Sequence, residues 1–216
     1  MRLDKDQLRD MDSRIRAAFV NSLSGFKSAN LVGTIDDDGR TNLAIMSSTV
    51  HLGSSPPLLA LVIRPGGEER HTLDNILSTG YYSINHVTAP IIEAAHQSAA
   101  RYGRDTSEFE ATGLTPFWRE GFAAPMVAEA GIKLGLALRE HQELSINRTH
   151  LVIGEVVLAE IPPGSLRDDG GVDLVKAGSV ALSGLDTYYK SVAFKRMAYA
   201  KPGLTPRDLF QHEVSD

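Results

Sequence analysis

Apolar residues occupy every second position through residues 130–138 of this chain of 216 residues. A repeat of two is that of a β-strand with one buried face, because successive side chains of a strand point to opposite sides. A helix repeats every 3.6 residues and cannot bury this pattern on one face. The apolar segment 150–161 is the expected partner strand, so an antiparallel pair forms the framework of the fold. The alternating positions are Ala130, Ile132, Leu134, Leu136 and Leu138.

Further strands are predicted where short apolar runs lie between turn signals. These runs cover residues 29–35, 41–52, 58–64 and 81–87. Asp and Gly in residues 36–40 provide the tight turn of a hairpin between the first two runs. A calcium loop would need acidic ligands beyond the glycine, whereas Arg40 and Thr41 follow it here, so we expect a plain turn.

Helices are expected around the sheet, over residues 1–25, 71–80 and 89–103, with a short one after the polar stretch 162–173. Asp4 and Gln7 have the spacing of a capping box at the start of the first helix. Residues 65–70 and 104–125 are expected to be loops. The fold class is therefore mainly β with helices (α+β), an antiparallel barrel with peripheral helices rather than a doubly wound parallel sheet. We expect one domain over residues 1–216, with a tail over 191–216.

Composition excludes several classes of protein. The chain has no cysteine, so disulfides and thiolate metal sites are ruled out. Its net charge is −5 without a lysine or arginine run, which argues against nucleic acid as a partner. The apolar run 58–63 is too short to cross a bilayer, and the first twenty residues lack the apolar region of a signal peptide. We expect a cytoplasmic protein with neither nucleic acid nor membrane as a partner.

Common catalytic and nucleotide-binding motifs are absent. The chain has no GxGxxG after a strand, no GxxxxGK[ST], no GxSxG and no HExxH. Its seven histidines form no helical i, i+4 pair, so no metal site is expected. Those at positions 51, 86, 96 and 141 are predicted to be structural.

One constellation has the chemistry of a phosphate site, which needs hydroxyl donors, a helix N-terminus and arginine. The hairpin and the short Pro56–Pro57 link bring three groups of donors toward one end of the barrel. The alternative is a polar strand edge, a solvated arginine and an ordinary helix cap, and spacing alone favours that ordinary interpretation. The three groups are Ser47, Ser48 and Thr49; Arg64; and Arg70, His71 and Thr72.

Several segments in order resemble the flavin reductase-like family, the FMN-binding split barrels. They are the V-G-T strand with its acidic turn, the N-L-A stretch leading into serines, S-S-P-P-L with the following strand, the R-H-T-L-D-N-I helix start with its strand, and the segments 107–116 and 149–157. The likeness covers residues 29–190. The chain departs from the family at Ile45, where proline is common, and at His71, where aspartate often precedes the threonine.

The resemblance implies non-covalent FMN at a homodimer interface. Ser47, Ser48 and Thr49 would line the isoalloxazine and ribityl chain, and Asn42 would help to shape the site. Arg64, Arg70 and Thr72 would face the phosphate, with His71 beside them. His150 matches a catalytic-site histidine near the nicotinamide in related reductases; the alternative is a strand-start histidine bonded to backbone.

The implied activity is an NAD(P)H-dependent flavin oxidoreductase, with hydride transfer from nicotinamide to flavin and a monooxygenase as a candidate partner. Such chemistry belongs to the cofactor, which agrees with the absence of a recognisable triad. Three alternatives stay open: a flavoredoxin-like electron carrier, a pyridoxamine-phosphate-oxidase-like enzyme, and a ligand-free or haem-binding barrel.

Overall fold

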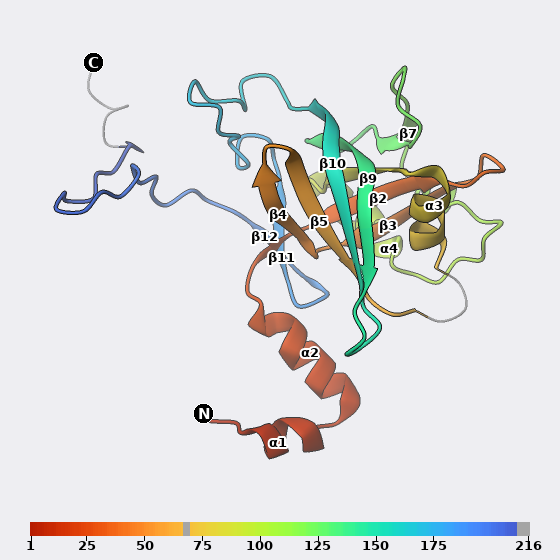
Figure 1. Cartoon of the computed structure of the whole chain (residues 1–216), viewed down its shortest axis with the longest axis horizontal. Coiled ribbons are helices and arrows are strands. Elements are labelled where there is room, and N and C mark those ends of the chain that lie inside the picture. The colour runs from red at the N-terminus through yellow and green to blue at the C-terminus, as the bar shows by residue number, and fades with distance from the viewer. Residues whose placement is uncertain (67–69, 211–216) are drawn as a thin grey trace.

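The computed structural model describes residues 1–66 and 70–210 (Figure 1). Its strands are β1 (Lys27–Ser28), β2 (Asn30–Ile35), β3 (Thr41–Met46), β4 (Thr49–Ser54), β5 (Pro57–Ile63), β6 (Tyr81–His86), β7 (Pro116–Phe117), β8 (Met126–Val127), β9 (Lys133–Glu143), β10 (His150–Glu160), β11 (Val180–Ser183) and β12 (Thr187–Lys190). Its helices are α1 (Lys5–Asp10), α2 (Ser13–Leu23), α3 (His71–Thr79), the 3₁₀ turn η1 (Ala89–Ile91), α4 (Ile92–Gln97) and α5 (Glu108–Thr112).

Seven strands form one antiparallel sheet in the order β3-β2-β6-β9-β10-β5-β4. The two edge strands, β3 and β4, are consecutive in the chain and only Ser47 and Ser48 separate them. Two residues reach about 7 Å, so the sheet must curl until its edges nearly meet. The Val62 N–H donates to the Ser48 carbonyl at 3.1 Å, which places Ser48 on the β5 side of the split. The expected antiparallel split barrel with peripheral helices is confirmed.

The long pair β9–β10 carries the predicted alternation. His150 pairs with Glu143 and Glu160 with Lys133, with register shifts between Ile153 and Gly154 and again further along. The alternate residues of β9 point into the barrel, where they meet apolar side chains from β2, β5, β6 and β10 and the inner face of α3. This interior cluster contains Val32, Leu61, Leu73, Ile76, Tyr82, Ile84, Leu136 and Val152.

A second core covers the other face of the β2–β3 region. Leu31 and Leu43 point away from the barrel interior, toward α4, α5 and the small three-stranded sheet β1-β11-β12. Phe109 from α5 is almost fully buried there, and Val180 comes from β11. Both faces of this part of the sheet are therefore covered, which explains why β2 is buried at all but its last position.

Several expectations about individual elements were wrong. The single strand expected over 41–52 divides at Ser47 into β3 and β4, because the chain crosses the split there. The opening helix is interrupted: the Asp4–Gln7 capping box is present, but Asp12 caps a second helix by accepting from the N–H groups of Arg14 and Ile15. The expected loop 104–125 contains α5 and the short strand β7, and turns replace the short helix expected after residue 173. The expected loop 65–70 lies partly outside the described residues.

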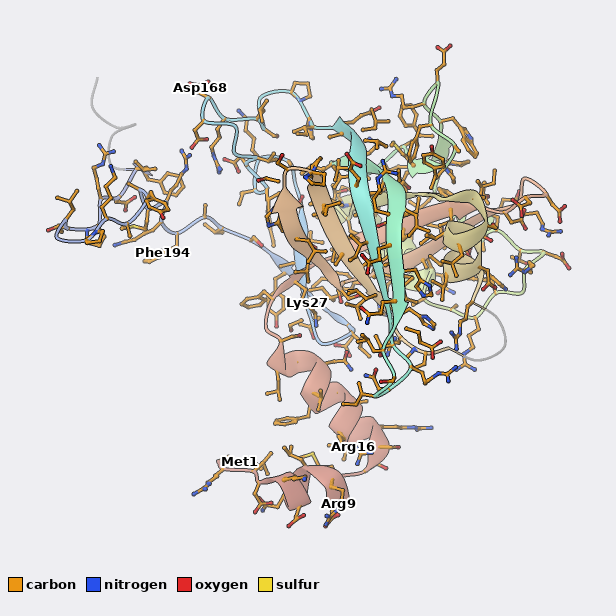
Figure 2. The ribbon with its side chains drawn as sticks, in the orientation of Figure 1. Met1, Arg9, Arg16, Lys27, Asp168 and Phe194 are labelled. Carbon is orange, nitrogen blue, oxygen red and sulfur yellow. The ribbon has the colours of Figure 1, made fainter. Side chains whose placement is uncertain are left out.

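Both ends of the described chain project from the barrel (Figure 1). Helices α1 and α2 bury none of their residues. The segment after β12 leads away on another side, and Figure 2 shows Phe194 on this departing stretch, where its side chain is 88% exposed. No helix among residues 1–66 and 70–210 has both the length and the apolar character needed to span a membrane.

Gly154 provides a test of the barrel interior. A Cβ atom at this position would overlap the hydroxyl of Tyr82, which is fully buried on β6. We expect Gly154→Ala to lower the free energy of unfolding by about 1–3 kcal/mol, the usual cost of overpacking. Urea unfolding measures this loss. Tyr82→Phe removes the overlapping atom, so the double variant should recover part of it; equal losses with and without the Tyr82 change would contradict this packing.

Candidate functional site

One end of the barrel gathers most of the predicted phosphate-binding residues. His150, the first residue of β10, pairs with Ile63, and Arg64 follows Ile63 directly. Helix α3 lies across this end, since Arg70 at its N-terminus contacts His150 and Thr72 in its first turn contacts β3. The structure therefore brings Arg64, Arg70, Thr72 and His150 to the same end of the barrel.

Among residues 1–66 and 70–210, no side chain caps the N-terminus of α3. Its N-cap residue is Arg70, whose side chain cannot accept a hydrogen bond from the helix. By contrast, Asp4 caps α1 and Asp12 caps α2. The first turn of a helix carries the positive end of its dipole. This nine-residue helix thus begins with its positive end beside an arginine, an arrangement suited to an anion.

A buried hydrogen-bond network fixes α3 against the sheet. The Nδ2 of Asn42 on β3 donates to Thr72 Oγ1 at 2.9 Å and to Thr34 Oγ1 at 3.2 Å. Asn75, one turn after Thr72, donates from Nδ2 to the same Thr34 oxygen at 3.1 Å. All four residues are buried. Because buried polar groups cost free energy when unpaired, this network holds the first turn of α3 in one place.

Thr34 and Asn75 were not among the residues predicted from the sequence. A signal for them exists, since Thr72 and Asn75 are polar residues on the buried face of an otherwise amphipathic helix. The structure places Asn42 beneath Thr72 as a support. Contact between Asn42 or Thr72 and a ligand stays a prediction.

His150 is nearly fully buried and contacts two side chains. Its Nε2 lies against the Arg70 guanidinium, and its Nδ1 lies 3.0 Å from His141 Nε2. The two imidazole rings are stacked, with centroids 5.2 Å apart. Burial lowers the pKa of His150 below its ordinary value, and the neighbouring Arg70 charge lowers it further. Side chains, rather than the backbone, are therefore its partners, and His141, which we had expected to be merely structural, belongs to the site.

The hydroxyl residues lie along the split of the barrel. Ser48 Oγ donates to the Val62 carbonyl at 2.5 Å, and Thr49 Oγ1 accepts from Asn30 Nδ2 at 3.3 Å. Ser47 is half-buried between them and the end of β3. Ser47, which follows β3 directly, is five positions beyond Asn42, or about 16 Å along an extended strand. The hydroxyl group and Asn42 therefore mark different parts of an extended site.

Ion pairs on the outer side of α3 attach it to the β2–β3 turn. Asp36 accepts from the backbone N–H groups of Asp38 and Arg40 and pairs with the Arg40 guanidinium, so the turn is plain, as expected. Arg104 pairs with Asp74 of α3 at 3.0 Å. A polar hollow lies beside these pairs, lined by Asp36, Arg40, Thr41, Asn42, His71, Asn75, Arg104, Thr106 and Glu108. The sequence patterns did not indicate this hollow.

In the described part of the chain, no group of three or more His, Cys, Asp or Glu residues has the geometry to hold a metal ion.

The donor set at the α3 end matches the needs of a flavin phosphate. It combines guanidinium groups, a threonine hydroxyl and a helix N-terminus, which are the groups that bind phosphate in proteins. Arg64 is exposed and therefore accessible to a ligand. The residues present thus fit the anionic end of FMN.

Comparisons with known proteins agree with the split-barrel fold. The family profile described as "Flavin reductase like domain" matches residues 24–176. A crystal structure of a candidate flavin reductase with a split barrel domain from Shewanella frigidimarina NCIMB 400 is 50% identical in sequence. It covers 93% of this chain and 100% of its own, with a TM-score of 0.89.

Two further relatives are less similar. Flavoredoxin of Desulfovibrio vulgaris (Miyazaki F) is 27% identical and has a TM-score of 0.69, covering 83% of this chain and 92% of its own. An uncharacterized protein of Deinococcus radiodurans is 32% identical over 118 residues, which is 54% of this chain. That match spans only 51%, about half, of the Deinococcus protein.

Glu108, which lines the hollow, should make the free energy of unfolding depend on pH. It is buried and accepts from the Leu43 N–H at 2.9 Å, and burial raises its pKa above the ordinary 4.5. The native state therefore binds this proton more tightly than the unfolded state does. The resulting stability is present below pH 4.5 and is lost as the pH rises through the higher native pKa. Urea unfolding at several pH values should show wild type losing stability relative to Glu108→Gln across that range. The exposed control Glu120→Gln should show no such trend, and a constant difference for Glu108→Gln would contradict the assignment.

Proposed function

Because the chain belongs to the flavin reductase like family, we propose that it is an FMN-dependent oxidoreductase that takes hydride from NAD(P)H and reduces flavin. The observation that carries this proposal is the N-terminus of α3 with Arg70 as its N-cap residue, at the barrel end where Arg64 follows β5. This end can neutralise a phosphate dianion without a metal ligand set.

The proposed roles follow from the positions of the residues. Arg64, Arg70 and Thr72 would hold the phosphate of FMN, with His71 beside it. Ser47, Ser48 and Thr49 at the split would lie along the ribityl chain and ring system, and Asn42 would support Thr72 from below. The buried network beneath α3 keeps the phosphate-binding groups in place before the cofactor arrives, which reduces the entropy cost of binding.

Bound FMN would supply the redox chemistry, accepting a hydride from reduced nicotinamide and passing the electrons on. The chain would bind and orient the two reactants and keep water out. No strong base is required of it. The catalytic role of His150 beside the nicotinamide stays a prediction, as do delivery of reduced flavin to a monooxygenase and a cytoplasmic location.

A second candidate function is that of an electron carrier. The similarity to a flavoredoxin favours it, since that relative is 27% identical over most of both chains. A carrier would hold FMN and exchange electrons with another protein without being reduced rapidly by nicotinamide. The pyridoxamine-phosphate-oxidase-like alternative has no specific observation in its favour.

The deciding experiment is an anaerobic stopped-flow measurement on the protein loaded with FMN. Purified protein with a visible flavin spectrum is mixed with NADH and, separately, with NADPH. Rapid bleaching of the flavin band supports the reductase. A yellow protein that stays oxidised with both reductants supports the carrier, and a protein that does not bind FMN at all contradicts both functions.

Removal of the phosphate-binding groups should weaken FMN binding. Each charge-assisted contact to phosphate contributes about 1.5–3 kcal/mol, or roughly ten- to a hundredfold in affinity. We therefore expect Arg64→Gln, and the double variant Arg70→Gln with Thr72→Val, to raise the FMN dissociation constant by such factors in a fluorescence titration. Arg119→Gln is the matched control, because Arg119 pairs with Glu160 at the far end of β10. Unchanged affinity in the first two variants would place the phosphate elsewhere.

Exposed apolar side chains on both projecting ends favour a homodimer. Monomeric proteins rarely expose so many large apolar groups together, and their burial against a second copy would stabilise an assembly. These residues are Ile15, Val20, Leu23 and Phe26 at one end, and Val192, Phe194, Tyr199 and Leu204 at the other.

Light scattering at micromolar concentration should therefore give about twice the chain mass of 23.4 kDa. The double variant Ile15→Ser with Phe194→Ser should shift the mass toward the monomer. Ile146→Ser, at an equally exposed position in the β9–β10 turn, serves as the control and should leave the dimer intact. A wild-type mass of one chain would contradict the proposal.

A further inference from the structure

We propose that His150 is a positioning residue for Arg70, and that His141 holds His150 in the one tautomer that allows this. The inference rests on the proposed function, because it assumes that Arg70 binds the phosphate of the flavin. It differs from the predicted role of His150, since here the imidazole acts through Arg70 and does not touch the nicotinamide.

The arrangement of protons follows from the chemistry of the three side chains. A guanidinium group has five N–H donors and no acceptor, so Arg70 can only donate to His150. The Nε2 of His150 must then accept, which leaves the ring proton on Nδ1. That proton points to His141 Nε2 at 3.0 Å, so His141 must accept there. Arg70 therefore donates to His150, and His150 Nδ1 donates to His141. This direction of the two hydrogen bonds requires both imidazole rings to be neutral.

The relay is anchored in the rigid part of the barrel. His150 is the first residue of β10, pairs with Ile63 on one side and Glu143 on the other, and is 3% exposed. His141 comes from β9 and stacks on it. Arg70, by contrast, lies just before α3, and its side chain is long and flexible. An acceptor on a rigid strand orders that side chain in advance, so less freedom is lost when an anion binds.

Arg70 keeps donors for an anion while it is held. One Nη1 hydrogen is directed at His150, and Nη2 makes only a long contact of 3.5 Å with the Gly66 carbonyl. Three further N–H groups of the five remain for a ligand. Helix α3 begins at the next residue, so one anion can lie near both the guanidinium and the positive end of the helix dipole.

The charges around His150 determine how the relay responds to pH. Arg70 faces His150 from the start of α3. His141 and Glu143 face it from β9, and Arg148 faces it from the β9–β10 turn. Arg148 also pairs with Glu143. Burial and the Arg70 charge keep the pKa of His150 low, so the ring is neutral at pH 7. Acidification through that lowered pKa would place a proton on Nε2, remove the acceptor and repel Arg70. Affinity for a phosphate-bearing ligand should fall as that proton is taken up.

The first test compares FMN with riboflavin, which lacks the phosphate. His150→Phe keeps a ring but removes the acceptor, and should weaken FMN binding about tenfold while leaving riboflavin binding unchanged. His150→Gln restores an acceptor and should recover most of the loss. In the Arg70→Gln background, His150→Phe should have no further effect. His141→Phe should act in the same direction as His150→Phe but less strongly, and His96→Phe, on the exposed side of α4, is the control.

The dependence of FMN affinity on pH is a measurement that a merely structural role of His150 would not change. The FMN phosphate itself takes up a proton near pH 6, so wild type is compared with Arg70→Gln at each pH. Only wild type should lose further FMN affinity as the pH falls, beyond the loss caused by the phosphate itself, by up to tenfold per pH unit. Parallel profiles for the two proteins would overturn the proposal, as would a His150→Phe variant that binds FMN normally but is reduced slowly by NADH.

A second test needs no flavin. Nitrogen-15 spectra of the histidine rings in the ligand-free protein should show His150 neutral, with its proton on Nδ1, and Arg70→Gln should raise the pKa of His150. A proton on Nε2, or an unmoved pKa, would overturn the relay. If neither FMN nor riboflavin binds, the proposed function is wrong, and the relay is then decided by these spectra and by whether inorganic phosphate binds more weakly to His150→Phe than to wild type.

Discussion

The two-residue passage between β3 and β4 is the constraint on which the rest of the structure depends. These strands are the opposite edges of a seven-stranded sheet, yet only Ser47 and Ser48 separate them. A sheet with such a short link between its edges can only curl into a barrel, and the Val62 N–H to Ser48 carbonyl bond secures the closure. The same closure places a row of half-buried hydroxyl residues at the split, beside the end of β5, which pairs with the start of β10. The proposed flavin site is thus a direct product of how the sheet closes.

Helix α3 depends on a second constraint, the need to pair buried polar groups. Thr34, Asn42, Thr72 and Asn75 are all removed from water, and each lost hydrogen bond there would cost about 1–3 kcal/mol. Their network holds the helix in one orientation, in which its N-terminus lies at the end of the barrel. The ion pair of Arg104 with Asp74 supports the same orientation from outside. Stability and the presentation of anion-binding donors therefore rest on the same contacts.

Local patterns predicted much of the fold because they report short-range physics. The alternation through residues 130–138 identified β9, Asp and Gly identified the β2–β3 turn, and the capping box of Asp4 and Gln7 marked the start of α1. Patterns failed where a distant contact decides. Nothing within 41–52 reveals that the strand must break at Ser47, since β5 supplies the partner of the second half. His141 looked structural because its neighbour His150 is nine residues away in the chain but stacked on it across two paired strands.

By itself the sequence determined the class of fold, the order of the strands along the chain and the residue types available for a phosphate, since periodicity, turn chemistry and donor inventory are all local properties. Only the tertiary structure decided which of those residues meet. It brought Arg70 to His150, stacked His141 on His150, and placed Asn42 under Thr72. The contact of Arg70 with His150 joins residues 80 positions apart in the chain, and that of Asn42 with Thr72 joins residues 30 positions apart. Such contacts exist because barrel closure and the burial of polar groups act on the whole sheet at once.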